Sequence, residues 1–325
     1  MSSNKPPLPV LSGAMPHHLD HLAPFAWLKQ THLWVEDPAI GEMAKRYYPD
    51  VPLIQKPFDI VEAASLSDII VVSTKAAPAE LKAIATTLGL TGCKFAFLPH
   101  GQSDKGLADP LMRSIEHADI AYLYGALQHQ RLTEFGSIKT IGHIEFVGNY
   151  RKAYYEAHRA SLDAITYEEV FSSFKNDHPT YLYAPTWSND SLIKHAKPLI
   201  EALPDQVNLI IKLHPLIEKI HPAYAYLIQS YDQARGNIRV IDSFPLIYPL
   251  LARIDGYIGD ESAIGYDFLH FDKPMFFLTD DDLPLYECGV KVSDVPNLIK
   301  SLSSPQKAFS SLRAHRAALA WSYLT

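Results

Sequence analysis

The sequence has little cysteine, no basic excess and no long apolar run. Only Cys93 and Cys288 occur among its 325 residues, and they form no metal-ligand spacing, so the simplest interpretation is a reduced, cytoplasmic chain with unpaired thiols. The formal net charge of −7 argues against a nucleic-acid partner, because no surplus of Lys and Arg is available to neutralise a run of phosphates. A small phosphate-bearing ligand needs only a helix end and a few donors, so it is not excluded.

No run of about 18 apolar residues, the length needed to span a bilayer, is present. The polar start, Met1–Pro7, lacks the apolar segment of a secretory signal. We therefore expect a cytoplasmic protein. Peripheral contact with the inner face of a membrane stays open, and so does the oligomeric state.

What the sequence does contain is an ordinary share of apolar residues and a repeated alternation of strands and helices. With 325 residues, 47% hydrophobic and 20% charged, the chain is long enough for two globular domains. Short apolar segments alternate with segments of helical period such as Ala79–Leu88, a pattern typical of a parallel sheet covered on both faces. The expected strands are residues 8–13, 32–35, 51–54, 68–73, 94–98 and 120–124, then 180–185, 207–213, 238–241, 256–258 and 275–278.

The predicted fold class is α/β, with two doubly wound, Rossmann-like domains in tandem. Residues 1–150 would form the first domain and 151–325 the second, because the polar, helical stretch 150–177 lacks an obvious strand and is typical of a bridge. An amphipathic helix over 305–321 would then be able to pack back on the first domain. Ligands of such folds bind outside the carboxyl ends of the strands, so residues that directly follow a strand are the site candidates.

The central candidate is an elbow at residues 259–262, between a buried strand and an amphipathic helix. The first N–H groups of that helix, together with its dipole, favour an anion, most often phosphate. Asp260 and Ser262 are the side chains that the elbow offers. Capping of the helix by Ser262 is the competing explanation.

Two further strand ends carry basic side chains. His100 follows the strand 94–98 and precedes Gly101, which suits a general base or a phosphate donor; the alternative is a loop histidine bound to a neighbouring carbonyl. Lys212 and His214 are two residues apart, so they share one face of a strand end. There they could hold a diphosphate and stabilise a leaving phosphate, or they could be an edge-strand lysine and a capping histidine.

Other polar residues at strand ends have simpler explanations. Thr186 and Ser243 could donate to a phosphate, ribose or nucleoside, but helix capping explains each of them. The acidic run 279–283 is better explained as a solvated loop than as a metal site. The histidines within residues 17–21 have the helical spacing of a metal pair; without further ligands we expect them to line the cleft or cap polar surface. We predict neither a metal nor another cofactor.

The order of these motifs resembles one family. The matching residues are His100-Gly101, Tyr183-Ala-Pro-Thr-Trp187, Lys212-Leu-His-Pro215, Gly259-Asp-Glu-Ser262 and Asp272-Lys-Pro274. They follow one another as in the CDP-glycerol:glycerophosphotransferases of teichoic-acid-type polymer synthesis, which have the GT-B fold. Each motif is short, so their joint order, over roughly residues 95 to 280, carries the resemblance.

The resemblance implies two Rossmann-like domains that face each other across a cleft, the first for the acceptor and the second for the nucleotide donor. It implies transfer of a glycerol-phosphate, or similar polyol-phosphate, from CDP-glycerol or a related activated donor to a glycan or polyol-phosphate acceptor in cell-envelope synthesis, with release of CMP. His100 would be the base, His214 with Lys212 would hold the diphosphate, and Ser262 with the elbow backbone would bind phosphate. Positioning and charge neutralisation are what such a transfer mainly needs.

Two other functions fit the same sequence. A GT-B glycosyltransferase would use a nucleotide sugar with His100 as base, and an epimerase on the same fold is a weaker variant. A non-catalytic descendant would bind only a nucleotide or a partner protein. The first domain matches the family least, and the chain lacks the basic amphipathic segment that often brings family members to a membrane, so the donor half of the resemblance is the firmer one.

Overall fold

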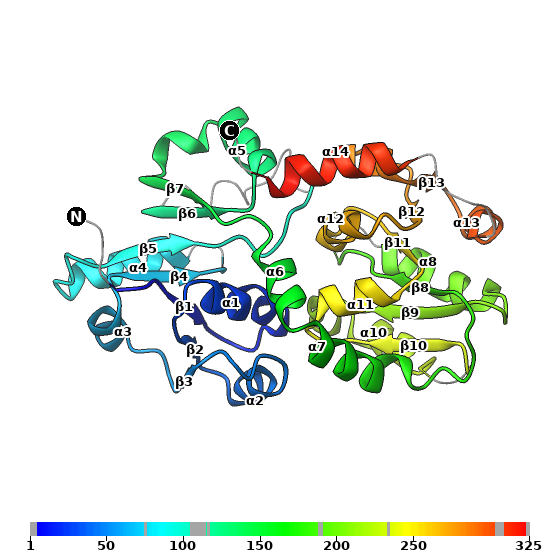
Figure 1. Cartoon of the computed structure of the whole chain (residues 1–325), viewed down its shortest axis with the longest axis horizontal. Coiled ribbons are helices and arrows are strands. Elements are labelled where there is room, and N and C mark those ends of the chain that lie inside the picture. The colour runs from blue at the N-terminus through cyan, green and yellow to red at the C-terminus, as the bar shows by residue number, and fades with distance from the viewer. Residues whose placement is uncertain are drawn as a thin grey trace. The chain divides into compact units, whose positions relative to one another are not determined.

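The structure is a computed structural model that describes residues 5–74, 77–104, 115, 118–187, 191–232, 235–302 and 309–322. The chain divides into two compact units. The first consists of Met1–Gln102, Gly106–His158 and Leu319–Thr325, and the second of Ser103–Lys105 and Arg159–Ala318. Each unit is built on one parallel sheet with helices around it (Figure 1), so the predicted fold class is confirmed.

The sheet of the first unit has seven strands in the order β3-β2-β1-β4-β5-β6-β7, and all of its pairs are parallel. Its strands are β1 (Leu8–Leu11), β2 (Leu33–Val35), β3 (Leu53–Gln55), β4 (Ile69–Val72), β5 (Lys94–Phe97), β6 (Ile120–Leu123) and β7 (His143–Phe146). Its helices are α1 (Pro16–Leu28), α2 (Pro38–Tyr47), α3 (Ile60–Leu66), α4 (Ala77–Thr87), α5 (Ala126–Glu134), the 3-10 helix η2 (Ser137–Thr140) and α6 (Tyr150–Ala157).

The helices of the first unit begin where the sequence provides a start signal. Pro16 occupies the first position of α1, where its missing N–H leaves no bond unmade. The Asp37 carboxylate accepts from the N–H groups at the start of α2, and Asp59 does the same for α3. Such caps satisfy donors that have no partner within the helix.

The strand order of the first unit reverses between β1 and β4. β1 pairs with β2 on one side, where Val10 lies opposite Trp34, and with β4 on the other, where Leu8 lies opposite Ile70. This reversal is the topological switch point of a doubly wound sheet, and ligands bind in the crevice beyond it. The segments that follow β1, β4 and β5 therefore lie at the edge of the sheet where a ligand is expected to bind.

The sheet of the second unit repeats this arrangement with six parallel strands in the order β10-β9-β8-β11-β12-β13. Its strands are β8 (Thr180–Tyr183), β9 (Asn208–Lys212), β10 (Ile238–Ile241), β11 (Gly256–Gly259), β12 (Met275–Leu278) and β13 (Val290–Val292). Its helices are α7 (Arg159–Thr166), a π-helical turn η3 (Tyr167–Phe171), α8 (Ser191–Ala202), α9 (Pro215–Ile220), α10 (Pro222–Gln229), α11 (Ile247–Arg253), α12 (Ala263–Phe268), 3-10 helices η4 (Leu269–Phe271) and η5 (Pro284–Cys288), and α13 (Val295–Leu302). The last helix, α14 (Ser310–Trp321), belongs to this unit up to Ala318 and to the first unit from Leu319.

The core of the second unit explains the continuous apolar strands of its sequence. One face of the sheet buries Ile211 and Ile258 against Leu199 of α8 and Leu298 of α13. The neighbouring strand residue Tyr257 is also fully buried, and it points to the opposite face because successive strand side chains alternate. Both faces are therefore covered, as a parallel sheet requires.

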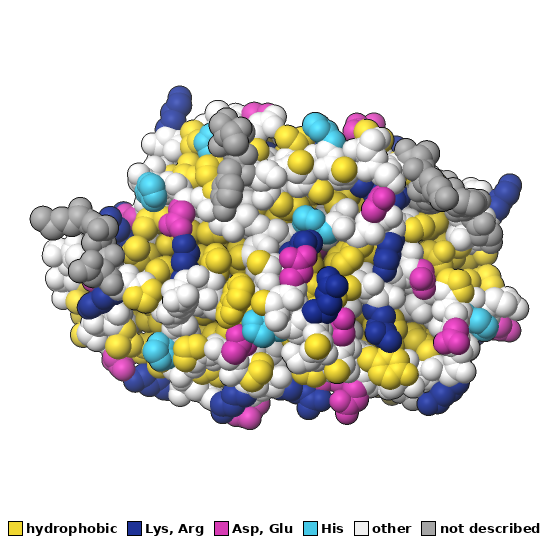
Figure 2. All heavy atoms as spheres, in the orientation of Figure 1, with side chains coloured by type: hydrophobic (Ala, Val, Ile, Leu, Met, Phe, Trp, Pro, Cys, Tyr) yellow, Lys and Arg dark blue, Asp and Glu magenta, His cyan; other side chains and the backbone are white. Residues whose placement is uncertain are grey.

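Two strands, β7 and β13, were not predicted. Each lies at an edge of its sheet, and each is a short segment with a charged residue inside it, Glu145 or Lys291. Within the described residues, no helix is long and apolar enough to cross a membrane. On the face drawn in Figure 2, acidic and basic side chains are interspersed without a broad field of one sign.

Candidate functional site

The elbow of the second unit follows β11, which lies beside β8 at the switch point of that sheet. Gly259 is the last residue of β11, and a Cβ at this position would lie 2.0 Å from the Tyr257 hydroxyl oxygen, so a larger residue would displace the Tyr257 ring. The Tyr257 ring is fully buried, and burial, followed by the charge of Asp260, raises the pKa of its phenol well above the ordinary value. Tyr257 therefore stays protonated beneath the elbow.

The Asp260 carboxylate faces the protein backbone. It is fully buried, and it accepts from the Thr186 N–H with both oxygens at 2.9 Å and from the Ser262 N–H at 3.1 Å. These bonds tie the segment after β8 to the elbow after β11, across the switch point. A buried carboxylate held by backbone donors suits a structural support better than a ligand for phosphate, since two anions repel each other.

Ser262 is the N-cap residue of α12, but its side chain makes no capping bond to that helix. Its hydroxyl instead lies at hydrogen-bonding distance of the Tyr257 phenol. Thr186 is buried as well, and its backbone is held by Asp260. Ser243 is exposed after β10 and its N–H donates to Asp242. Ser188, the neighbour of Trp187, lies outside the described residues.

Lys212 and His214 lie at the end of β9, the second strand from the edge of the sheet. The Lys212 ammonium donates to the Phe244 carbonyl at 2.8 Å. His214 caps α9, because its Nδ1 accepts from the Leu216 N–H at 3.2 Å. In the neutral ring the proton is then on Nε2, so Nε2 is the donor nitrogen of His214.

His100 follows β5 in the first unit. Its Nδ1 lies 3.3 Å from the carbonyl oxygen of Ser73, which follows β4. A carbonyl only accepts, so Nδ1 carries the proton and, in the neutral ring, Nε2 carries the lone pair. His100 is therefore held in the tautomer whose Nε2 can act as a base, at the carboxyl edge of the sheet.

The structure gathers the histidines of α1 around His100. The ring centre of His18 lies 4.8 Å from that of His100, and the rings of His17 and His21 lie 5.9 Å and 6.4 Å from it. Burial, then the neighbouring His100 and His17, lowers the pKa of His18 to about 2. Burial and Arg151 lower the pKa of His21 well below the usual range. The buried rings of His18 and His21 are therefore neutral.

Sequence reasoning gave this cluster too little weight, although its helical spacing was visible. Its partner, His100, is about 80 residues away in the sequence, and only the crossover order of the sheet brings the ends of β1, β4 and β5 together. Among the described residues, no group of His, Cys, Asp or Glu side chains is arranged to hold a metal ion. The chemistry that this histidine cluster best fits is therefore acid–base catalysis.

The rest of the buried polar face of α1 is satisfied by an ion pair. The Arg151 guanidinium donates to the Asp20 carboxylate and, at 3.1 Å, to the Asp20 carbonyl. The Tyr48 hydroxyl donates to the same carboxylate at 2.8 Å. Buried charges persist when they are paired and hydrogen-bonded, so this network fixes α1 beside the histidine cluster.

A short segment beyond His100 belongs to the second unit. The buried Asp104 carboxylate accepts from the Tyr266 hydroxyl of α12 at 2.7 Å and from the Leu285 N–H at 2.8 Å. The Ser103 hydroxyl donates to the carbonyl of Glu261, inside the elbow, at 3.0 Å. These bonds of Asp104 could not be predicted, because nothing in the sequence pairs residue 104 with a helix that begins 159 positions later.

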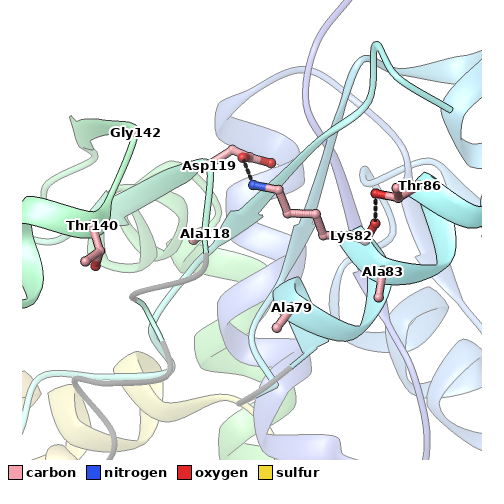
Figure 3. A pocket seen from close by; sticks show the side chains of 8 residues that line it. All are labelled: Ala79, Lys82, Ala83, Thr86, Ala118, Asp119, Thr140 and Gly142. Carbon is pink, nitrogen blue, oxygen red and sulfur yellow. Dashed lines mark hydrogen bonds and ion pairs between the residues drawn. The ribbon is translucent and has the colours of Figure 1, made fainter.

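A pocket of about 550 Å³ in the first unit lies away from these strand ends (Figure 3). It is lined by Ala79, Lys82, Ala83, Thr86, Ala118, Asp119, Thr140 and Gly142. Asp119 directly precedes β6, so the pocket lies at the amino edge of the sheet. Asp119 pairs with Lys82 at 2.5 Å through one oxygen and accepts from the Phe95 N–H through the other. Its main charged groups thus bind each other, and we do not assign the site there.

Solved structures of similar fold cover nearly the whole chain. The S. aureus MnaA–UDP co-structure matches with a TM-score of 0.64 and 13% identity, over 98% of this chain and 92% of that chain. The wall teichoic acid polymerase TagF matches with 0.63 and 16%, over 98% and 84%. A putative UDP-N-acetylglucosamine 2-epimerase from Listeria monocytogenes matches with 0.61 and 14%, over 99% and 93%. These identities show the fold, which is the expected GT-B type.

Part of the second unit matches a known protein family. No curated protein matches the chain, but residues 167–289 match the family described as CDP-Glycerol:Poly(glycerophosphate) glycerophosphotransferase. The matched range contains all the candidate residues of the second unit, and His100 lies outside it. The resemblance read from the sequence is thereby confirmed: residues 167–289 are similar to the CDP-glycerol:poly(glycerophosphate) glycerophosphotransferase family of transferases.

Proposed function

We propose that the chain moves a glycerol-phosphate, or similar polyol-phosphate, unit from CDP-glycerol to an acceptor hydroxyl and releases CMP. The observation that carries the proposal is the placement of Lys212 and His214 at one strand end of the family-matched unit, with a cationic ammonium on one and an Nε2–H donor on the other. Such donors suit a diphosphate, which carries several anionic oxygens.

The transfer needs one bond to form and one to break. The acceptor oxygen attacks the phosphorus that bears glycerol, and the bond from that phosphorus to the oxygen bridging the two phosphates breaks. CMP leaves with the electron pair, and Lys212 and His214 neutralise the charge that develops on it. Ser262 and the elbow backbone bind phosphate in this proposal, with Asp260 as the support of the elbow and Thr186 and Ser243 on the donor side.

His100 is the base of the proposed reaction. Its Nδ1–H is committed to the Ser73 carbonyl, so its Nε2 accepts the proton of the acceptor hydroxyl. The neutral His18 beside it adds no positive charge that would oppose protonation of His100. The acceptor is a glycan or polyol phosphate of the cell envelope in this proposal, reached from the cytoplasmic side of the membrane.

The similar solved structures support a nucleotide-linked donor but do not distinguish a CDP-linked donor from a UDP-linked one. One similar structure is a TagF variant soaked with CDPG, and another is a co-structure with UDP. The likeness to MnaA and to a UDP-N-acetylglucosamine 2-epimerase favours a second candidate, a nucleotide-sugar enzyme on the same fold. The two candidates differ in the nucleotide that they bind and release.

A donor screen separates the candidates. The purified chain is incubated with CDP-glycerol, CDP-ribitol or UDP-sugars, with and without a polyol-phosphate acceptor, and the released nucleotide is measured alongside ligand-induced thermal stabilisation. We expect CMP release from a CDP-polyol, lowered about 10²- to 10⁴-fold in His100→Gln and strongly in His214→Gln. His143→Gln, a change at an exposed histidine at the start of β7, is the control and should keep activity.

Other results would redirect the proposal. Release of UDP or conversion of a UDP-sugar, without stabilisation by any cytidine nucleotide, would show that the chain is a nucleotide-sugar enzyme and not a glycerol-phosphate transferase. Nucleotide binding without turnover, with a biological role that survives in His100→Gln and His214→Gln, would indicate a non-catalytic descendant.

A further inference from the structure

The peptide segment that carries His100 is held on both sides by buried side chains of the first unit. The Tyr124 hydroxyl donates to the carbonyl of Pro99 at 3.0 Å, and the Gln128 amide donates to the carbonyl of Gly101 at 3.3 Å. Gly101 has a φ of +122°, a conformation that glycine adopts easily and other residues rarely. The backbone around His100 is therefore bent sharply and fixed at both neighbouring carbonyls.

The contacts of Tyr124 determine which atom donates in each bond. Its hydroxyl lies 3.0 Å from the Pro99 carbonyl, 2.7 Å from His21 Nδ1 and 3.2 Å from the Tyr150 hydroxyl. A phenol has one proton to donate and two lone pairs that accept. The carbonyl can only accept, so it receives the Tyr124 proton, and the hydroxyl then accepts from His21 Nδ1–H and from Tyr150.

This assignment makes His21 a fixed donor. Its Nδ1 carries the proton, and burial keeps the pKa of the ring well below the usual range, so it is neutral. Burial and Tyr124 raise the pKa of Tyr150 well above its ordinary value, so Tyr150 also keeps its proton. Two permanent donors therefore point at the Tyr124 oxygen, and they orient its own proton toward Pro99.

Gln128 is oriented in the same way. Its Oε1 accepts from the Tyr124 backbone N–H at 2.8 Å, which directs its NH₂ group to the Gly101 carbonyl. The Tyr124 and Gln128 side chains are buried, so water does not compete readily for these bonds. One residue, Tyr124, thus supports His100 twice: through its hydroxyl and, by way of Gln128, through its backbone.

We propose that Tyr124 and Gln128 are positioning residues for His100, which hold its backbone so that its ring keeps Nδ1–H on the Ser73 carbonyl and presents Nε2 to the acceptor hydroxyl. The inference rests on the proposed function for its catalytic consequence, whereas its structural part stands on this hydrogen-bond network alone. Neither residue touches substrate in this assignment. A misplaced base lowers the rate of the chemical step far more than the binding of substrate.

The first experiment needs no activity. In the full chain labelled with ¹⁵N-histidine, the ring correlations of His100, assigned by their loss in His100→Gln, should report the Nδ1–H tautomer. In Tyr124→Phe and Gln128→Leu the His100 signals should shift or show exchange between tautomers. Tyr150→Phe removes the longer of the two bonds to the Tyr124 hydroxyl, at 3.2 Å, but leaves the His21 donor at 2.7 Å and both carbonyl bonds, so the His100 signals should stay close to wild type. Unchanged His100 signals in Tyr124→Phe and Gln128→Leu would overturn the proposal.

The second experiment uses whichever donor the screen identifies. We expect Tyr124→Phe and Gln128→Leu to lower kcat about 10- to 100-fold with little change in KM, while Tyr150→Phe stays near wild type. Equal losses in Tyr124→Phe and Tyr150→Phe would show that the network serves stability only and would overturn the positioning role. If wild type releases no nucleotide from any donor, the proposed function fails, and the tautomer measurement alone decides whether these residues hold His100.

Discussion

Asp260 accepts the Thr186 N–H with both of its carboxylate oxygens, each at 2.9 Å. This contact joins the segments after β8 and β11, which are 74 residues apart in the sequence, at the switch point of the second sheet. The same carboxylate also accepts from Ser262, at the start of α12. The elbow after β11 is therefore supported by one buried charge.

Asp260→Asn should destabilise the second unit. The amide keeps one acceptor oxygen but turns an NH₂ group toward backbone donors, and a hydrogen bond to a charged group contributes about 1.5–3 kcal/mol. We expect a loss of that size in the free energy of urea unfolding. Asp282→Asn is the control, because Asp282 is 94% exposed and pairs only at the surface with Lys291. Equal midpoints for Asp260→Asn and wild type would contradict the supporting role.

The buried His18 should make the first unit less stable in mild acid. Its folded pKa, about 2, lies below the ordinary 6.5, so unfolding takes up a proton at any pH between these values. The free energy of unfolding therefore falls as the pH drops below about 6.5, by up to about 1.4 kcal/mol per pH unit for one proton. Above 6.5 this contribution is fully present.

Replacement of His18 tests that slope directly. In His18→Asn, the change in unfolding free energy between pH 6.5 and 5 should contain about one proton less than in wild type. His143→Asn, at an exposed position, is the matched control for the loss of one imidazole side chain. A wild-type slope in His18→Asn would mean that the ring is already protonated in the folded chain.

The buried Arg313 should stabilise the second unit more than its neighbour Arg316. The Arg313 guanidinium donates to the Cys288 carbonyl at 2.8 Å and lies 3.5 Å from the Asp272 carboxylate. Arg313→Met leaves that carbonyl unpaired, at an expected cost of about 1–3 kcal/mol in unfolding free energy. The Arg316 side chain is 16% exposed, but its partner Glu287, at 3.5 Å, is 67% exposed, so that pair contributes less and Arg316→Met should cost less than Arg313→Met. Equal effects in urea unfolding would contradict this ranking.

Trp187 should report nucleotide binding. Its side chain is 39% exposed, and its ring centre lies 6.1 Å from that of His214, the proposed diphosphate ligand. Titration with CMP or CDP-glycerol should therefore change tryptophan fluorescence, and Trp187→Phe should lose most of that change while thermal stabilisation by the ligand remains. A full fluorescence response in Trp187→Phe would place the nucleotide beside another tryptophan.

Much of the fold could be predicted because buried parallel strands are continuous apolar runs. The interior strand 275–278 was predicted with the bounds that the structure has, and so was the edge strand 238–241, three of whose four residues are apolar. The missed strands β7 and β13 are edge strands, where one side of the backbone is unpaired and charged side chains are tolerated. An edge strand with only two apolar residues, such as β7 or β13, therefore leaves little of the apolar signal on which such a prediction depends.

The site was harder to predict than the fold for a physical reason. A motif shows which residue follows a strand, but not which strand ends lie together. Asp260 was expected to help bind phosphate, yet its carboxylate accepts from the backbone N–H groups of Thr186 and Ser262. The roles of His18 and Tyr124 depend on contacts with Pro99 and His100, far away in the sequence, that only the strand order creates.

Neither unit is one continuous stretch of the chain. Residues Ser103–Lys105 belong to the second unit, and Leu319–Thr325 to the first, where the Ala126 N–H at the start of α5 donates to the Ser322 carbonyl at 2.9 Å. A gene fragment that stops after His158 would therefore encode the first unit without residues 319–325, which accept the hydrogen bond from the start of α5. The complementary fragment would encode the second unit without Asp104, which binds Tyr266 of α12. Chimeras that exchange donor specificity between relatives should carry these two short segments with the unit to which each belongs.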